Sequence, residues 1–134
     1  FDMSEEKASG GCSCGKLRYQ ISQPPKVVAI CHCRSCQLAA GAESVGWAVC
    51  ASSAFTWLTP EPKYFKSSEN VTRSFCGDCG TALSYQANAD YIDVTLASFD
   101  KPEQFPPKNE VWLKHRISWN PANPNLKSFE EAGS

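Results

Sequence analysis

The sequence has little net charge, few histidines and no long apolar run. Its 134 residues carry a formal net charge of -1 and include only two histidines. A charge this close to zero excludes a strong bulk attraction to nucleic acid or to anionic lipid. Its longest apolar runs, such as residues 27–30, are far shorter than a membrane span, and no charged start followed by an apolar stretch indicates secretion. We therefore expect a cytoplasmic protein, with no nucleic-acid or membrane partner, that recognises its ligand through local contacts.

The sequence also lacks internal repeats, linkers and low-complexity segments, so it fits a single domain. A chain of this length can bury a modest core without external help. Residues 1–9 are polar, and we expect them to form a disordered tail with no part in the fold. Residues 10–134 would then make up the domain.

Cysteine, by contrast, is abundant and clustered. Seven of the eight cysteines lie in three groups: Cys12 with Cys14, Cys31 with Cys33 and Cys36, and Cys76 with Cys79. Thiols one or two residues apart make poor disulfide partners but can converge on one cation. In a reducing compartment such groups are more often metal ligands than disulfides, although an extracellular disulfide framework is the alternative. The spacing predicts thiolate-bound zinc.

The seven cysteines divide into a set of four and a set of three. The first and third groups each offer two thiolates from a glycine-flanked turn, and joining them closes a four-cysteine structural site. Three local thiolates in the middle group leave a fourth position for water or a ligand thiol, as a reactive zinc requires. We therefore predict two zinc ions, held by Cys12, Cys14, Cys76 and Cys79 and by Cys31, Cys33 and Cys36. A shared ion between the middle group and one flanking pair is the alternative, as is a purely structural role for both ions.

We do not assign the two histidines or the eighth cysteine, Cys50, to a metal site. In an extended Cys-His-Cys segment the ring of His32 points away from the ligand side, so we expect a pocket or packing role. His115, between Lys114 and Arg116, is interpreted as a surface or hydrogen-bonded imidazole. Cys50 ends an apolar segment and is interpreted as a small buried hydrophobe.

Alternation of side chains and turn signals predict many short strands. The predicted strands are residues 16–21, 27–30, 45–50, 54–58, 64–66, 72–75, 83–86, 91–96 and 111–113. We expect 45–50 to form a hairpin with 54–58, and 64–66 to pair with 72–75. Residues 35–40 predict a short helical turn that carries Cys36 and ends at Gly41. The pattern as a whole predicts a single all-β domain stabilised by zinc, with little helix.

The three cysteine motifs occur in a distinctive order with their neighbours. They are Gly11-Cys12-x-Cys14-Gly15 with Arg18-Tyr19, Cys31-His32-Cys33-x-x-Cys36 with Gly41, and Phe75-Cys76-x-x-Cys79-Gly80. With the later Trp119 and Phe129, they resemble the glutathione-dependent formaldehyde-activating enzyme family, whose domain is shared with centromere protein V. The resemblance covers residues 10–129 and implies a β-tent-like zinc fold. It implies structural zinc ligands at Cys12, Cys14, Cys76 and Cys79, and catalytic zinc ligands at Cys31, Cys33 and Cys36.

The resemblance also implies an activity, the condensation of formaldehyde with glutathione to S-hydroxymethylglutathione, which is a carbon–sulfur lyase reaction in reverse. A thiol at an open zinc position loses its proton readily and can then attack an aldehyde carbonyl. Arg34, Arg73, Lys114 and Arg116 are candidate donors to the carboxylates of glutathione, although each is more often a solvated surface charge. The alternative hypothesis is a non-catalytic zinc-bound β module that presents a protein- or thiol-binding surface.

Overall fold

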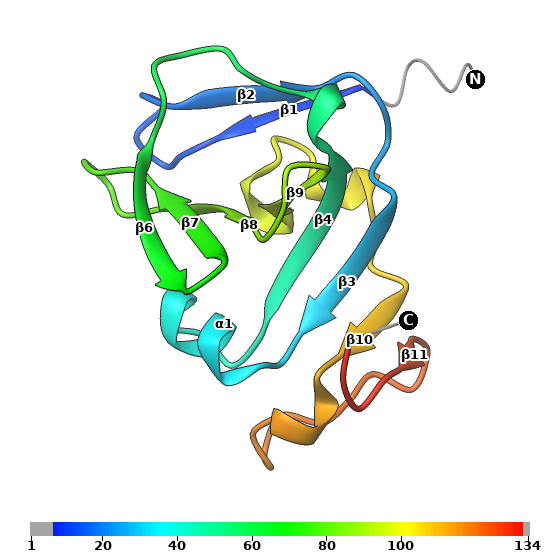
Figure 1. Cartoon of the computed structure of the whole chain (residues 1–134). Coiled ribbons are helices and arrows are strands. Elements are labelled where there is room, and N and C mark those ends of the chain that lie inside the picture. The colour runs from blue at the N-terminus through cyan, green and yellow to red at the C-terminus, as the bar shows by residue number, and fades with distance from the viewer. Residues whose placement is uncertain (1–6, 133–134) are drawn as a thin grey trace.

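The computed structural model describes residues 7–132, which form two β-sheets and a few short helical segments (Figure 1). The strands are β1 Ala8–Gly11, β2 Arg18–Ile21, β3 Val27–Cys31, β4 Val45–Ala51, β5 Phe55–Trp57, β6 Lys63–Ser68, β7 Val71–Phe75, β8 Ala82–Gln86, β9 Tyr91–Thr95, β10 Asn109–Val111 and β11 Lys127–Ser128. Helix α1 is Arg34–Ala40, and single 3₁₀ turns occur at Ser52–Ala54, Leu96–Ser98, Pro102–Gln104 and Leu113–His115. The predicted all-β domain with little helix is confirmed.

The two sheets differ in size and in strand direction. The small sheet has the order β1-β2-β5, and the large sheet has the order β11-β10-β3-β4-β9-β8-β7-β6. Neighbouring strands from β3 to β6 in the large sheet are antiparallel, whereas β10 pairs in parallel with β3 and β11 pairs in parallel with β10. No helix within residues 7–132 has the length and apolarity that a membrane crossing requires.

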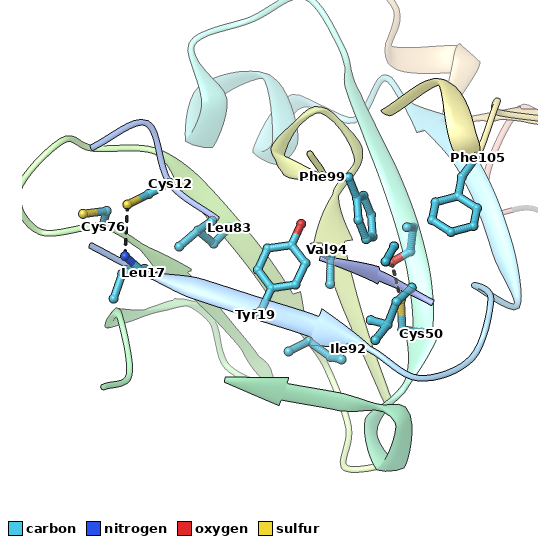
Figure 2. Packing of buried hydrophobic residues seen from close by; sticks show 13 residues of the cluster. Cys12, Leu17, Tyr19, Cys50, Cys76, Leu83, Ile92, Val94, Phe99 and Phe105 are labelled. Carbon is cyan, nitrogen blue, oxygen red and sulfur yellow. Dashed lines mark hydrogen bonds between the residues drawn. The ribbon is translucent and has the colours of Figure 1, made fainter. Parts of the chain in front are cut away.

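The main core lies between the two sheets. Tyr19 of β2 is fully buried, stacks on Phe55 with ring centroids 5.3 Å apart, and contacts the edge of Phe99. Figure 2 shows this ring among apolar side chains from the large sheet, including Ile92 and Val94. Because side chains alternate along a strand, the residues between these core positions face the other side of the large sheet. That second face carries the central cysteines.

The helical turn after β3 ends as the sequence predicts. Cys33 caps the start of α1, where its sulfur accepts a hydrogen bond from the amide of Cys36. Gly41 ends the helix at φ 62°, a left-handed conformation that glycine adopts without steric cost. Helix α1 follows the end of β3 (Figure 1), and the sulfur of Cys36 lies within 4.8 Å of that of Cys31, the last residue of β3.

One predicted pairing is confirmed, and one is wrong. β6 pairs with β7 as expected, and β8, which the sequence predicted only as a strand, pairs with β9 across a turn. The expected hairpin between residues 45–50 and 54–58 does not form, because β4 pairs with β3 and β9 while β5 pairs with β2. The 3₁₀ turn Ser52–Ala54 carries the chain from the large sheet to the small one.

The chain ends also differ from the expectation. Strand β1 begins at Ala8 and pairs with β2, so the ordered domain starts inside the segment to which we assigned no fold role. Residues 1–6 lie outside the described residues. Near the other end, β10 stops at Val111 and not at Leu113, because Trp112 adopts a left-handed conformation at φ 59°. Such a conformation is unusual for a bulky residue and cannot continue a strand.

Candidate metal centres and the adjoining cavity

The four flanking cysteines meet in one cluster. The sulfurs of Cys12, Cys14, Cys76 and Cys79 all lie within 4.8 Å of one another. The sulfur of Cys14 is 3.5 Å from that of Cys12 and 3.8 Å from that of Cys76. Sulfurs around a tetrahedral zinc with bonds of about 2.3 Å are about 3.8 Å apart, whereas a disulfide joins sulfurs at about 2 Å. All eight cysteines are free, so the cluster fits a zinc ion and not a pair of disulfides.

Two similar turns build this cluster. Gly15 and Gly80 end the turns, each at φ 81°, and their amides donate to the carbonyls of Cys12 and Cys76 at 3.1 Å and 2.8 Å. Figure 2 shows the Leu17 amide directed at the sulfur of Cys12, a distance of 3.3 Å. Amide donors of this kind favour the thiolate form that metal binding requires. The turns follow β1 and β7, so the cluster connects the two sheets.

Cys79 is one of two exposed cysteines in the cluster, and its thiol ionises readily. Hydrogen bonds from the side chain and then the backbone of Thr81 lower the pKa of the Cys79 thiol to about 5. The Thr81 hydroxyl lies 3.2 Å from the sulfur and also accepts from the Ser13 amide of the opposite turn. One threonine therefore contacts both turns and helps to hold the two cysteine pairs together.

Cys31, Cys33 and Cys36 form the second cluster, again with all sulfurs within 4.8 Å of one another. Cys31 ends β3, and the other two lie at the start of α1. Hydrogen bonds from Cys31 and Cys36 lower the pKa of Cys33 to about 2, while the hydrogen bond that Cys31 donates to Cys33 raises the pKa of Cys31. Three convergent sulfurs, one of them readily ionised, are a donor set that suits zinc. Within residues 7–132 this cluster has three members.

Arg73 contacts this second cluster from β7. Its side chain is 4% exposed, and Nη2 donates to the sulfur of Cys36 at 3.7 Å. Its guanidinium lies over the rings of Tyr85 and Trp47, at 5.0 Å and 5.9 Å from their centroids. Arg73 is therefore a buried cation beside the cysteine sulfurs and not a solvated surface charge. The sequence offered it only as one of four candidates.

The other cationic candidates are more peripheral. Arg34 is exposed and donates to Gln37 at 2.9 Å. Lys114 pairs with Glu131, and Arg116 donates to backbone carbonyls of the following segment. Of these three, Arg34 alone lines a hollow beside the central cluster.

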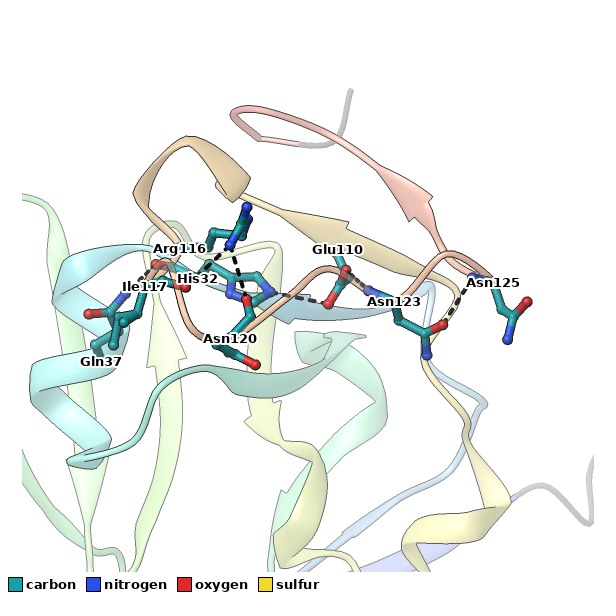
Figure 3. A network of polar contacts seen from close by, with 8 residues as sticks. All are labelled: His32, Gln37, Glu110, Arg116, Ile117, Asn120, Asn123 and Asn125. Carbon is teal, nitrogen blue, oxygen red and sulfur yellow. Dashed lines mark hydrogen bonds and ion pairs between the residues drawn. The ribbon is translucent and has the colours of Figure 1, made fainter.

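His32 lies away from the cysteines, as expected. Its ring is 1% exposed, and Nε2 donates to Oε1 of Glu110 at 3.1 Å, which assigns the proton to Nε2 because a carboxylate can only accept. The second oxygen of Glu110 accepts from the Asn123 amide at 2.8 Å. Figure 3 shows this relay from His32, directly after β3, through Glu110 of β10 to Asn123 in the carboxyl-terminal segment. His115 is exposed and stacks on Trp112, and Cys50 is buried in the main core.

A cavity of about 270 Å³ opens beside the central cluster. All three cysteines line it, together with the rings of Trp47, Tyr85 and Trp112, the carboxyl of Asp93, and the smaller side chains Val27, Ala29, Val49, Asn109, Val111 and Ala132. A second hollow of about 330 Å³ contains Arg34, Arg73 and His115 and shares Cys33, Tyr85 and Trp112 with the first. Cys33 thus stands where an apolar cavity meets a cationic one.

Asp93, Tyr85 and Trp112 were missed by the sequence analysis. Asp93 occupies a position in β9 where an alternating strand ordinarily places an exposed polar residue, so nothing in the sequence marked it. Trp112 gave no signal either, because neither its left-handed backbone nor the hydrogen bond from its amide to the Glu131 carbonyl has a local sequence pattern.

Comparisons with known proteins agree with this architecture. No curated protein matches the chain in sequence. A crystal structure of a Rhodobacter sphaeroides protein is similar in fold, with a TM-score of 0.59 and 15% sequence identity over 90% of this chain and 98% of that one. The family model described as glutathione-dependent formaldehyde-activating enzyme matches residues 7–115. The chain therefore belongs to the glutathione-dependent formaldehyde-activating enzyme family.

Proposed function

We propose that the protein is a zinc-dependent enzyme that adds a thiol such as glutathione to formaldehyde or a related aldehyde and cleaves the same adduct. It would act as a carbon–sulfur lyase of the S-(hydroxymethyl)glutathione synthase type. The observation that carries the proposal is the cluster of Cys31, Cys33 and Cys36, whose sulfurs converge beside a cavity. Family membership supports the choice of a thiol and an aldehyde.

Each cluster would hold one ion. Cys12, Cys14, Cys76 and Cys79 would bind a structural zinc with four sulfurs, and Cys31, Cys33 and Cys36 would bind the catalytic one. Zinc held by three thiolates supplies positive charge that favours the thiolate form of an added thiol. Free cysteines throughout the chain fit a reducing compartment such as the cytoplasm.

The surrounding residues suit such a substrate. Arg73 offsets the negative charge of the cysteine cluster, because its guanidinium donates to the sulfur of Cys36. Arg34 and His115 line the same hollow as Arg73, so the carboxylates of glutathione would find cationic donors there. Trp47 and Trp112 wall the apolar cavity and would limit the access of water to the reacting atoms.

Exchange NMR with glutathione and formaldehyde tests the proposal. The zinc-loaded protein is expected to accelerate interconversion of free and adduct forms above the spontaneous rate. Cys33→Ser should lose one zinc per chain and the acceleration while it keeps its fold. Cys50→Ala is the matched control, because Cys50 is buried outside both clusters and should keep both ions and the rate. A fully loaded protein without acceleration would remove the activity and favour a non-catalytic binding module.

A further inference from the structure

Asp93 is a carboxyl that the fold leaves without a partner. It lies in the middle of β9, is only partly exposed, and takes part in none of the ion pairs or side-chain hydrogen bonds found within residues 7–132. Removing a carboxylate from water without a compensating contact costs folding free energy. A carboxyl that destabilises the fold and lies at a cavity is a candidate functional group, because it does not contribute to stability.

The register of the sheet fixes where this carboxyl points. Asp93 lies opposite Val49 of β4 and opposite Tyr85 of β8, and residues that are directly opposite share one face of a sheet. Both neighbours line the 270 Å³ cavity, and so do Cys31, Cys33 and Cys36. Asp93 is the only carboxylate among the described residues that line this cavity. It therefore faces the same space as the three thiols.

The proposed reaction needs a group that moves a proton in this space. When a thiol adds to an aldehyde, the sulfur loses its proton, the carbon–sulfur bond forms, and the carbonyl π pair moves to oxygen. The oxygen must then gain a proton to give the hydroxyl group, and the cleavage direction must remove it. Asp93 and Tyr85 are the titratable groups besides the cysteines among the described residues that line the cavity, and the cysteines are occupied as ligands in the proposed function.

We propose that Asp93 is the general acid–base residue of this site, which rests on the function proposed above. Its carboxylic acid donates a proton to the carbonyl oxygen as the carbon–sulfur bond forms. The resulting carboxylate takes the proton of the next thiol that enters, so the cycle ends with the acid restored and no net change in protons. The cleavage direction runs through the same two transfers in reverse.

The electrostatic surroundings fit this role. Burial, followed by the negative charge of Cys36, raises the pKa of Asp93 to about 7, although Arg73 acts in the opposite direction. The other titratable groups on this face are Tyr85 of β8 and, across the cavity, Cys31 and Cys33, whereas Cys50 of β4 lies on the opposite face in the main core. General acid–base catalysis is most efficient when the pKa of the group lies near the working pH.

Asp93→Asn tests the proposal, since asparagine keeps the shape of the side chain and cannot transfer the proton. With glutathione and formaldehyde, we expect exchange catalysed by the variant to fall at least about 100-fold. The pH dependence of kcat/KM should lose the limb that reports this group. Zinc content should not change, and calorimetry should show that glutathione alone still binds. Asp93→Glu should recover part of the rate, because it restores a carboxyl.

Asp90→Asn is the matched control, because Asp90 is exposed in the turn before β9 and does not line the cavity. It should retain the wild-type rate and pH profile. A wild-type rate and profile in Asp93→Asn would overturn the inference and leave the proposed function intact. Loss of zinc or of glutathione binding in Asp93→Asn would also overturn it, since the residue would then be structural. An inactive wild-type protein would instead reject the proposed function and this role with it.

Discussion

Arg73 and Asp93 flank Tyr85 in one row across the large sheet. Arg73 lies opposite Tyr85, and Tyr85 lies opposite Asp93, so a buried cation and an unpaired carboxyl share one face with an aromatic ring between them. The guanidinium lies over that ring and donates to the sulfur of Cys36. The ring of Tyr85 separates the two charges, so they form no direct ion pair. Arg73 contacts the sulfur of Cys36, and Asp93 lines the cavity.

Arg73 should control how tightly the central cluster holds zinc. Arg73→Met removes the charge and the donor to Cys36, and we expect a loss in zinc affinity of about 10-fold or more at that cluster. Competition with a chromophoric chelator measures the effect. Arg73→Lys should lose part of the affinity, because lysine keeps the charge without the planar donor array. Lys66→Met, an exposed change on neighbouring β6, is the control. Equal affinities in all four proteins would contradict this role.

The four-cysteine cluster should be necessary for folding. Cys79→Ser removes one ligand of the site that connects the two sheets, and we expect Tm to fall by more than about 10 °C. Thermal melts followed by circular dichroism give the measurement, and metal analysis should show the loss of one zinc per chain. An unchanged melt would show that the cluster is not a structural metal site. Cys33→Ser provides the contrast, since the central cluster should be dispensable for the fold.

Glu110 should stabilise the protein because it accepts hydrogen bonds from two donors at once. Its two oxygens accept from His32 and from the Asn123 amide. Glu110→Gln offers only one acceptor oxygen, so one buried donor faces the amide NH₂ group, at a cost of about 2 kcal/mol in the free energy of unfolding. Urea denaturation measures this difference. Glu103→Gln, at an exposed position, should be neutral, and a Glu110→Gln variant as stable as the wild type would contradict the relay.

The raised pKa of Asp93 predicts how stability depends on pH. A carboxyl whose pKa rises from 3.8 to about 7 on folding contributes stability at low pH that is lost as pH rises through about 7. Asp93→Asn should therefore be more stable than the wild type, and its advantage should be larger at pH 8 than at pH 6 by about 1 kcal/mol. Denaturation at both pH values tests this, with zinc-loaded wild type and variant compared at the same pH. An advantage that shrinks with rising pH would contradict the sign.

Local features of the fold could be predicted from the sequence. The cysteine groups are visible because ligand spacing is itself a sequence pattern, and Gly41 marks the end of α1 because its φ requires glycine. Pairs of strands that follow one another, such as β6 with β7, were predicted because a short turn brings them together. The fold class and the grouping of the cysteines could therefore be predicted, because both depend on residues that are close together in the sequence.

Long-range features could not be predicted in this way. The parallel pairing of β10 with β3 joins segments from opposite ends of the domain and leaves no periodic signal in either one. Arg73 and Asp93 looked like ordinary polar positions of alternating strands, because alternation does not say whether the second face meets water or a cavity. Their roles depend on the row of Arg73, Tyr85 and Asp93, which forms only when three strands, β7, β8 and β9, pair.

The pairing of β10 with β3 also sets an order of assembly during synthesis. All four cysteines of the flanking cluster are present once Cys79 has left the ribosome, but the relay from His32 must wait for Glu110 and Asn123. Because chains emerge from the amino terminus, the four-cysteine cluster can close on a nascent protein while β3 still lacks its parallel neighbour. The second edge of the strand that presents Cys31 is therefore covered only after residues 109–111 have been translated, whereas its pairing with β4 involves residues made much earlier.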